Sequence, residues 1–582
     1  MSSSVATTRV VASDGVSLAV YEHGDPTRPT ILAVHGYPDD HRVWDGVAAN
    51  LVSRYHVVSY DVRGAGASGA PDRQHGYRLD QLADDLARVA DTASPGQPVH
   101  LLGHDWGSVQ CWHALTDQRL LGRVASFTSI SGPSLDHAGA WMRVRLRRPT
   151  PRRLRELVTQ LAASSYIALF QLPALPELLW RIGVLPRVMR ILSSGDNGFA
   201  PPRTKDAVRG LELYRANMFA RLGHPRPEAV GVPVQVLAPS RDRFVTPALQ
   251  TADLAAWVTQ PWVRTIPGGH WLPRARPDVV ARCVSELVEH LDGAPAAPAL
   301  RRAAQSARPK AEYADALIVV TGAGSGIGRA TAMAFAERGA HVVVADRDEP
   351  AAKDTVTRIQ NGGGSASSVA VDVADAEAMT HFAERLLAEH GVPQVVVNNA
   401  GIGMSGPFTE TTLRDWRQVI DVNLWGVIHG CRLFAAPMIA HGEGGQIINL
   451  ASAAAYLPSR MLPAYATTKS AVLMLSQCLR AELAEHGIGV VAICPGLVHT
   501  NITMTARFVG TDDSEQRRRQ QTSHVMYSRR DYSPERAARE ILRAARRNTA
   551  VAPVTPEARI ALTASRLTPA LLRAAARQRI KL

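Results

Sequence analysis

The pentapeptide Gly103-His104-Asp105-Trp106-Gly107 places a carboxylate where a side chain could act as a nucleophile. Glycines two positions before and two after Asp105 are what a sharp strand-to-helix turn requires, and such a turn pushes its central side chain out above the sheet. A carboxylate is ionised at neutral pH, so it can attack a saturated carbon without a base to activate it. The motif predicts chemistry through an alkyl ester on Asp105, although the same pentapeptide also occurs in structural turns.

Three further segments could supply the groups that make and break such an ester. The segment 35–38, with the sequence HGYP, follows an apolar run, so the backbone N–H of Tyr37 could form an oxyanion hole with that of Trp106. Asp242 follows a second apolar run, and His270 lies in IPGGHW. A histidine oriented by an acid can take a proton from an attacking water. Nucleophile, acid and histidine come in the chain order that an α/β-hydrolase fold requires.

Together these motifs, over roughly residues 10–292, resemble the epoxide hydrolases of the α/β-hydrolase superfamily. The resemblance implies that Asp105 opens the epoxide, that His270 oriented by Asp242 activates the water, and that the product is a vicinal diol. It also implies that Tyr166 and Tyr214, in the contexts SSYIALF and LELYRAN, are the family's two cap tyrosines, which bind the epoxide oxygen and assist ring opening.

A haloalkane dehalogenase is the main alternative, because it uses the same aspartyl ester and often has a tryptophan beside the nucleophile, as Trp106 stands here. Halide release needs N–H donors, and Trp141 or Trp180 could supply the second one. Tyr37 stands where many dehalogenases have an asparagine, and the two cap tyrosines favour an epoxide. A serine esterase is disfavoured because it would need a hydroxyl side chain in place of Asp105.

The second half of the chain carries TGAGSGIG at residues 321–328, after an apolar run and before a helical stretch. Backbone N–H groups at such a helix N-terminus can bind a pyrophosphate. The GxxxGxG spacing resembles that of the classical short-chain dehydrogenase/reductase family, over roughly residues 314–555, and implies a nicotinamide dinucleotide cofactor. The loop residues expected to contact it are Gly322, Ser325, Gly326, Ile327 and Gly328.

The same resemblance assigns the rest of the cofactor site. Asp346 ends the second apolar run, where its carboxylate would bind both ribose hydroxyls and repel a 2′-phosphate, which favours NAD(H). Arg347 could instead neutralise that phosphate, so NADP(H) stays open. The remaining expected contacts are Asp372 and Val373 at the adenine, Asn399, Ala400 and Gly401 in the NNAG motif, and Pro495, Gly496 and Thr500 toward the nicotinamide.

Asn423, Ser452, Tyr465 and Lys469 complete the catalytic tetrad that the family resemblance implies, and Tyr465 and Lys469 also contact the cofactor. The last two are one helical turn apart and share a helix face. The Lys469 ammonium is therefore expected to lower the pKa of Tyr465, which would exchange a proton with the carbinol or carbonyl oxygen. Ser452 would polarise that oxygen, Asn423 would support a proton-relay water, and residues 500–530 would form a substrate loop.

Short β-branched runs alternate with helical stretches throughout, which indicates parallel sheets covered on both faces. A chain of 582 residues is too long for one core. The prediction is an α/β protein with an N-terminal α/β-hydrolase fold and a C-terminal Rossmann-fold dehydrogenase with a parallel sheet. The expected boundaries are 1–292 for the hydrolase with a helical cap at about 133–230, 293–315 for an Ala/Pro/Arg-rich linker, 316–555 for the dehydrogenase, and 556–582 for a basic tail.

Composition adds limits. The segment at the N-terminus lacks the pattern of a signal peptide, and no apolar run approaches the roughly 20 residues of a membrane span, so a cytoplasmic location is expected.

The five cysteines are widely spaced and include no CxxC pair, so they favour neither disulfides nor a metal site. The net charge is +13, yet no nucleic-acid-binding motif accompanies it. Arg559, Arg566 and Arg573 recur every seven residues in the tail, as one face of an amphipathic helix would, although Pro569 interrupts it, and this suggests peripheral contact with an anionic membrane.

The order of the two halves resembles the fusions of epoxide hydrolase and short-chain dehydrogenase found in mycobacteria and relatives. This architecture predicts a bifunctional enzyme that opens a lipophilic or lipid-derived epoxide and then oxidises an alcohol with NAD, because fusion keeps one product near the next site. A homo-oligomer formed through the dehydrogenase domain is also expected. The alternatives are a dehydrogenase with an unrelated tethered hydrolase and, as a different class, a nucleic-acid-binding scaffold.

Overall fold

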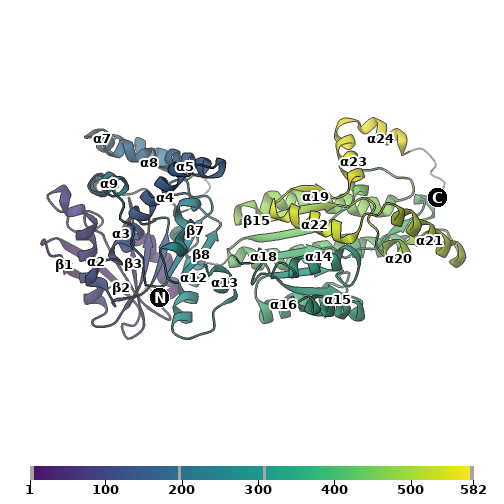
Figure 1. Ribbon diagram of the computed structural model, residues 1–582, viewed down its shortest axis with the longest axis horizontal. Helices are drawn as coiled ribbons and strands as arrows, with labels where there is room; N and C mark the ends of the chain where they lie inside the picture. Colours follow the sequence, from purple (N-terminus) through teal and green to yellow (C-terminus); the bar gives the residue numbers. More distant parts are fainter. Residues whose placement is uncertain (1–5, 194–197, 306–309, 577–582) are drawn as a thin grey trace. The chain divides into compact units, whose positions relative to one another are not determined.

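A computed structural model describes residues 6–193, 198–305 and 310–576. The chain divides into two compact units, Met1–Pro309 and Lys310–Leu582. Each unit is built around a predominantly parallel sheet with helices on both faces (Figure 1), so the predicted fold class is confirmed.

The first unit contains an eight-stranded sheet. Its strand order is β1-β2-β4-β3-β5-β6-β7-β8, in which β1 and β2 run antiparallel to their neighbours and the remaining pairs are parallel. The central strands are buried along their whole length, as continuous apolar runs predict. The strands are β1 (Ala6–Val11), β2 (Ser17–His23), β3 (Thr30–Val34), β4 (His56–Tyr60), β5 (Val99–His104), β6 (Val124–Ile130), β7 (Val234–Pro239) and β8 (Pro261–Ile266).

Helices cover both faces of this sheet. One face packs against α2 (Leu79–Ala93) and α3 (Trp106–Ala114), and the other against α1 (Asp45–Leu51) and α12 (Pro277–Leu291). Between β6 and β7 the chain leaves the sheet and forms a helical cap. In the described part, the cap contains α4 (Leu135–Arg147), α5 (Pro151–Ala163), α6 (Tyr166–Phe170), α7 (Leu175–Arg181), α8 (Val184–Leu192) and α9 (Thr204–Gly223).

The second unit has a seven-stranded sheet of order β11-β10-β9-β12-β14-β15-β17, parallel throughout. The order reverses between β9 and β12, and ligands bind at such reversals in open α/β sheets. The strands are β9 (Leu317–Thr321), β10 (His341–Asp346), β11 (Ser365–Ala370), β12 (Val395–Asn398), β14 (Gly445–Leu450), β15 (Ile488–Cys494) and β17 (Val551–Pro553).

Two groups of helices enclose this second sheet. Its faces are covered by α14 (Gly326–Ala336) and α22 (Pro534–Arg546) on one side and by α16 (Ala376–His390), α18 (Gly426–His441) and α19 (Pro463–Leu483) on the other. Within the described residues the stretch Leu413–His441 has the length and apolar composition of a membrane span, and the bent pair α5–α7 would be a second. Val427, Phe434 and Met438 of the first stretch lie in the core of this unit, so packing accounts for its apolar character.

One expected segment differs from the structure. The linker expected at 293–315 contains a short helix, α13 (Pro298–Ala303), whose Leu300 is buried with Trp262 in the core of the first unit. The linker is rich in alanine, whose small side chain packs without producing a visible apolar period, so the sequence pattern missed this contact. The basic amphipathic tail expected at 556–582 forms two helices in its described part, α23 (Pro556–Leu567) and α24 (Pro569–Ala575), with the break at Pro569.

Candidate active sites

Asp105 lies in a sharp turn between β5 and α3. Its backbone is in the left-handed region, with φ of 50°, and its side chain is turned out of the sheet. A Cβ atom on Gly107 would overlap the carbonyl oxygen of Val34, and one on Gly36 would lie 2.5 Å from the Asp105 side chain. Glycine is therefore required where α3 and the neighbouring loop approach each other around the carboxylate.

The predicted partners of Asp105 surround it. Its Oδ1 accepts a hydrogen bond from the Tyr37 backbone N–H at 2.7 Å, and its Oδ2 is 3.4 Å from His270 Nε2. His270 Nδ1 is 3.1 Å from Asp242 Oδ2. The backbone N–H of Trp106 is the first of α3, where an intrahelical partner is lacking. The structure thus brings together a carboxylate, an imidazole, a second carboxylate and two backbone donors.

The two carboxylates control the charge of His270. Burial disfavours the imidazolium, but Asp242 and Asp105 outweigh it and raise the pKa of His270 to about 10. Asp242 is buried too, yet His270 and the backbone N–H groups of Phe244 and Val245, both 2.9 Å from Oδ1, hold the pKa of this carboxyl below its ordinary value. At neutral pH the site therefore holds an imidazolium between two carboxylates.

Both predicted cap tyrosines face this site. Tyr166 begins α6 and Tyr214 lies on α9, with their rings 6.0 Å apart, and the Tyr214 ring is 4.9 Å from that of Trp106. Burial, followed by the charge of Asp105, raises the pKa of Tyr166, and burial and the same charge also raise that of Tyr214. Both hydroxyls therefore stay protonated at neutral pH and can donate.

The two tryptophans considered as halide donors have other contacts. Trp141 stacks against the guanidinium of Arg145, whose carbon is 3.8 Å from the ring centroid. Trp180 packs edge-on against Tyr37, with the centroids 6.1 Å apart. Trp180 thus packs against the loop that carries Tyr37. These ring contacts leave the indole N–H groups of Trp141 and Trp180 buried and without a hydrogen-bond partner among the described residues.

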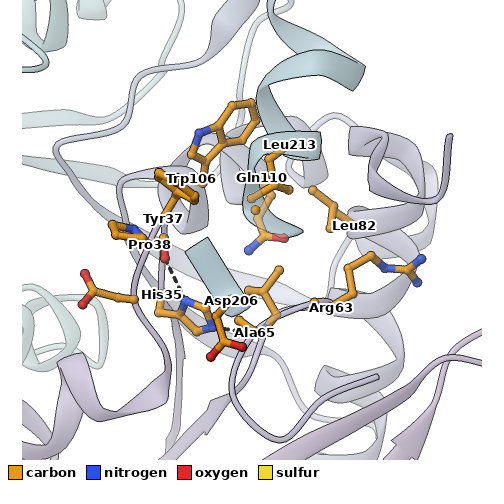
Figure 2. Close-up of a pocket in the computed structure, with 15 residues that line it drawn as sticks. His35, Tyr37, Pro38, Arg63, Ala65, Leu82, Trp106, Gln110, Asp206 and Leu213 are labelled. Atoms are coloured by element: carbon orange, nitrogen blue, oxygen red, sulfur yellow. Dashed lines mark hydrogen bonds between the residues drawn. The ribbon is translucent and has the colours of Figure 1, made fainter. Parts of the chain in front are cut away.

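A small cavity lies behind the same loop (Figure 2). It has a volume of about 20 Å³ and is lined by His35, Tyr37, Arg63, Gln110 and Asp206 among others. This is room for about one water molecule and excludes a substrate. His35 Nε2 accepts a hydrogen bond from Val62 N–H at 2.8 Å, so His35 braces the loop that presents the Tyr37 N–H, a role the sequence analysis did not assign.

In the second unit the glycine-rich loop joins β9 to α14. Gly322 and Gly326 have positive φ, and a Cβ on Gly328 would overlap the carbonyl oxygen of Gly322, so the helix begins directly against the strand end. Asn399 Nδ2 donates to the carbonyl oxygens of Thr321 and Gly322 at 2.9 and 3.0 Å, and this amide bridge fixes the loop.

The expected cofactor residues converge on one large cleft of about 1360 Å³. Asp346 Oδ2 accepts the Gly324 N–H at 2.8 Å, so the carboxylate sits at the rim of the glycine loop with Arg347 beside it. Gly328 is the exception, because it packs beneath the loop instead of lining the cleft. The lining residues are Gly322, Ser325, Gly326, Ile327, Asp346, Asp372, Val373, Asn399, Ala400, Gly401, Tyr465, Lys469, Pro495, Gly496 and Thr500.

Three members of the predicted tetrad, Ser452, Tyr465 and Lys469, line that cleft, and Asn423 is buried behind Gly401 of its wall. Lys469 Nζ donates to the Leu450 carbonyl oxygen at 2.8 Å and lies 5.9 Å from the centre of the Tyr465 ring. Asn423 sits in a π-helical turn and binds both backbone groups of Ile402 through its amide, at 2.8 and 3.0 Å. Ser452 lies near enough to Tyr465 to hydrogen-bond its oxygen.

The charge state of this tetrad differs from the expectation. Burial raises the pKa of Tyr465, opposed by the hydrogen bond with Ser452, so Lys469 does not control it. Lys469 is itself buried, which lowers its pKa to about 8 and leaves a fraction of the amine neutral near neutral pH. Desolvation dominates because both groups lie below the surface of the cleft, which spacing along a helix cannot reveal.

Other lining residues were missed in the sequence. The expected substrate loop is largely helical, as α20 (Ile502–Thr505) and α21 (Asp513–Arg529), and α21 places Tyr527 near Tyr465. Burial followed by Tyr465 raises the pKa of Tyr527 to about 12. Leu572 and Ala576 of the expected tail also line the cleft. Neither segment carries a recognisable motif, so the sequence held no signal for them.

Comparisons with known proteins agree with this division of the chain. Residues 29–273 match the family model "alpha/beta hydrolase fold", and residues 316–508 match "short chain dehydrogenase". The chain is 43% identical over 584 residues to "Probable oxidoreductase EphD" of Mycobacterium tuberculosis (strain ATCC 25618 / H37Rv) and, equally, to the protein of that name in Mycobacterium bovis, with 98% of each chain covered.

Further relatives match the second unit alone. The chain is 38% identical over 186 residues to "3beta-hydroxysteroid dehydrogenase 1" of Eggerthella lenta, covering 32% of this chain and 71% of the relative. Among solved structures, a short chain dehydrogenase/reductase from Burkholderia phymatum in complex with NAD is 28% identical, with a TM-score of 0.41 and coverage of 47% of this chain and 99% of that one.

The titration of His270 provides a test of the first site. Replacing Asp242 by asparagine is expected to lower the pKa of His270 from about 10 toward its ordinary value of 6.5, because it removes the main charge that stabilises the imidazolium. Because the folded state binds the His270 proton more tightly than the unfolded state does, protonation raises the free energy of unfolding of the unit. This contribution is complete below pH 6.5 and is lost as the pH rises through about 10.

The measurement is an NMR pH titration of histidine ring carbons, with the His270 signal identified by its loss in His270→Gln. The remote, exposed carboxylate of Asp25 provides the control, since Asp25→Asn should leave the His270 titration in place. An unchanged His270 pKa in Asp242→Asn would contradict the electrostatic account.

Proposed function

The chain belongs to the family of two-domain enzymes in which an alpha/beta hydrolase fold precedes a short chain dehydrogenase, and from this premise we propose its two reactions. The first unit hydrolyses an epoxide to a vicinal diol through an ester on Asp105. The second unit interconverts an alcohol and a ketone with NAD(H). The single observation that carries the hydrolase proposal is Asp105 at the elbow, in contact with both the Tyr37 N–H and His270.

In the first step, an Asp105 oxygen attacks an epoxide carbon. A carbon–oxygen ester bond forms, the ring carbon–oxygen bond breaks, and the ring oxygen takes a proton from Tyr166 or Tyr214. Burial and the Asp105 charge raise the pKa of each phenol, so both are still protonated when the substrate arrives. The charge that raises them disappears as the ester forms, so each phenol becomes a stronger acid as its proton is needed.

In the second step, water attacks the ester carbonyl and the N–H groups of Tyr37 and Trp106 stabilise the oxyanion. Esterification has removed the Asp105 charge, so the pKa of His270 falls and the ring, after losing a proton to solvent, can accept one from the water. Cleavage of the acyl carbon–oxygen bond releases the diol, which leaves with that proton. The proton remaining on Asp105 restores the tyrosine, and His270 is protonated again beside the re-formed carboxylate.

The haloalkane dehalogenase alternative has weaker support. It needs two N–H donors directed at a leaving halide. Trp141 and Trp180 contact Arg145 and Tyr37, but their buried N–H groups have no hydrogen-bond partner within the described residues, so the choice between the two reactions rests on the phenols. Two protonated phenols at the nucleophile suit a leaving oxygen, which must gain a proton, and do not suit a halide, which leaves as an anion.

In the second unit, the fit of a nicotinamide dinucleotide rests on the glycine loop, where any Cβ on Gly322 or Gly328 would meet backbone, and on the carboxylate of Asp346 at the cleft rim. The bound cofactor would accept or supply the hydride. Tyr465 exchanges the proton with the substrate oxygen, Ser452 binds that oxygen, and Lys469 and Asn423 position the tyrosine and the adjoining backbone. NAD(H) is favoured over NADP(H) by Asp346.

The cleft also supports a lipophilic substrate. Beyond the residues expected to contact the cofactor, its wall includes the apolar side chains of Met461, Phe508, Met526 and Leu572. Two large apolar side chains of this unit are exposed, Trp425 at the end of the π-helical turn and Met474 on α19. They support assembly into a homo-oligomer through the dehydrogenase.

Trapping the ester tests the first reaction. His270→Gln should open an epoxide but hydrolyse the ester slowly, so mass spectrometry of the Asp105 peptide should show the added mass of the substrate. With the wild-type protein, a single turnover in ¹⁸O-water should place the label in Asp105, because water attacks the acyl carbon. Label found directly in the diol would mean that water opens the ring, and an adduct formed only from a haloalkane would favour the dehalogenase.

Cofactor choice gives a second test. Asp346→Asn is expected to lower the ratio of kcat/KM for NAD to that for NADP by about tenfold or more, because it removes the charge that repels a 2′-phosphate. The matched variant Arg347→Ala should change the ratio in the opposite direction, since it removes the cation available to that phosphate. Steady-state kinetics with each cofactor measures both, and equal ratios in all three proteins would rule out this basis for selection.

We further propose that the two reactions act in sequence. Full-length protein given the epoxide of oleic acid and NAD should form the diol and then NADH. Tyr465→Phe should stop at the diol, and Asp105→Asn should form NADH only when the diol is supplied. If neither that diol nor related alcohols reduce NAD, the two activities are merely tethered.

A further inference from the structure

The outer helices of the hydrolase cap expose apolar side chains to solvent. The structure places α5, α7 and α8 along the edge of the cap beyond α4 and α9 (Figure 1). Each carries a stripe of exposed side chains three or four residues apart, which is one face of a helix. The stripes are Leu154, Val158 and Leu161 on α5, Leu175, Leu178 and Ile182 on and after α7, and Val184, Val188 and Ile191 on α8.

This exposure is concentrated in one short segment. Of the 26 large apolar side chains that are exposed among the described residues, 13 lie between positions 144 and 192. Val158 and Ile191 are 63% and 67% exposed. Soluble proteins rarely expose so many apolar groups together unless the surface binds a partner. The continuous stretch of α5 and α6, taken together with α7 after a sharp bend, even reaches the length and mean hydropathy of a membrane span.

The same segment is strongly basic. Residues 143–192 contain ten arginines and two glutamates. Glu156 pairs with Arg145 and Arg152, and Glu177 pairs with Arg215, so both acidic groups are already neutralised. Arg181 also interacts electrostatically with Glu177. The other arginines of the segment form no ion pair with a carboxylate within the described part of the chain, namely Arg143, Arg147, Arg148, Arg153, Arg155, Arg187 and Arg190.

We propose that this face of the cap, residues 143–192, docks on the surface of an anionic lipid bilayer. The apolar stripes would enter the boundary between head groups and acyl chains, while the arginines reach the lipid phosphates. Arginine side chains suit both surroundings, because their stems lie along apolar surface while the guanidinium stays in water.

A second copy of the chain is a poorer occupant. A twofold dimer pairs a surface with itself, and this surface would then set unpaired arginines against the same arginines. An anionic membrane instead supplies negative charge and an apolar interior together, which matches both properties of the cap.

The docking face is the outer surface of the helical cap, and the same cap carries Tyr166 and Tyr214, which lie near Asp105. The cap could therefore admit an apolar substrate from the bilayer, if the proposed function is correct. Membrane binding itself requires no turnover, so its failure and the failure of the hydrolase proposal can be told apart.

Placing the membrane contact on the cap revises the expectation that the tail at 556–582 makes this contact. Arg559 pairs with Glu540, and Leu572 lines the dehydrogenase cleft, so α23 and α24 are partly committed to their own unit. Within the residues that the structure describes, the cap has both the larger apolar surface and the denser unpaired positive charge.

Vesicle sedimentation of the full-length protein tests the proposal. The wild type should bind vesicles that contain phosphatidylglycerol, bind pure phosphatidylcholine weakly, and lose affinity in high salt because charges are screened. The double variant Val158→Asp/Ile191→Asp should bind anionic vesicles about tenfold or more weakly. A matched double variant, Leu121→Asp/Leu413→Asp, adds the same charge at exposed apolar positions elsewhere and should bind like the wild type.

Each remaining outcome overturns the proposal. Equal vesicle binding by both double variants would show that the cap face is not the docking site. Loss of binding in the tail variant Arg566→Glu/Arg573→Glu alone would assign the contact to the tail. If the wild type binds no vesicles and forms an oligomer that Val158→Asp/Ile191→Asp dissociates, the occupant is a second copy of the chain. Analytical ultracentrifugation measures that oligomer.

Thermal unfolding serves as the control for all variants, because an unchanged unfolding temperature shows that each variant is folded.

Discussion

Both sites depend on one steric constraint, the close approach of a helix N-terminus to backbone at the end of a parallel strand. In the first unit Gly107 lets α3 begin against the backbone of β3, and in the second Gly328 lets α14 begin against the loop after β9. A Cβ at either position would overlap a carbonyl oxygen. The resulting turns lie at the carboxyl ends of parallel strands, where open α/β sheets bind ligands. The same backbone geometry therefore presents a side chain in one unit and backbone N–H groups in the other.

Electrostatics then separates the two sites. The first concentrates charge, with an imidazolium held between the carboxylates of Asp105 and Asp242. In the proposed reaction, consuming the Asp105 charge as an ester would change the acidity of His270 and of the cap tyrosines at the same time, so each step would prepare the next. The second site instead suppresses charge, since burial raises the pKa of Tyr465 and lowers that of Lys469. With a pKa of about 8, Lys469 is still mostly protonated near neutral pH, and it lies beside the neutral phenol of Tyr465.

The fold class and the family of each half could be predicted because sterically demanding motifs leave few alternatives. Glycine spacing around Asp105 and in the loop at 321–328 is local, so the sequence displays it directly. The structure also brings His270 and Asp242 to Asp105, while their catalytic roles remain predictions. Properties that depend on depth or on distant packing were not visible, among them the burial of Leu300, the placement of Tyr527, and the raised pKa of Tyr465.

The cap shows most clearly why a linear pattern is insufficient. Helix α5 buries Leu157 and Gln160 but leaves the neighbouring apolar side chains Leu154, Val158 and Leu161 exposed, so its apolar face is wider than the part that is covered. The apolar face of an amphipathic helix is normally buried. The hydrolase unit covers only part of this face. The exposed stripe therefore calls for a second apolar medium, and the arginines beside it restrict that medium to one with a negatively charged surface.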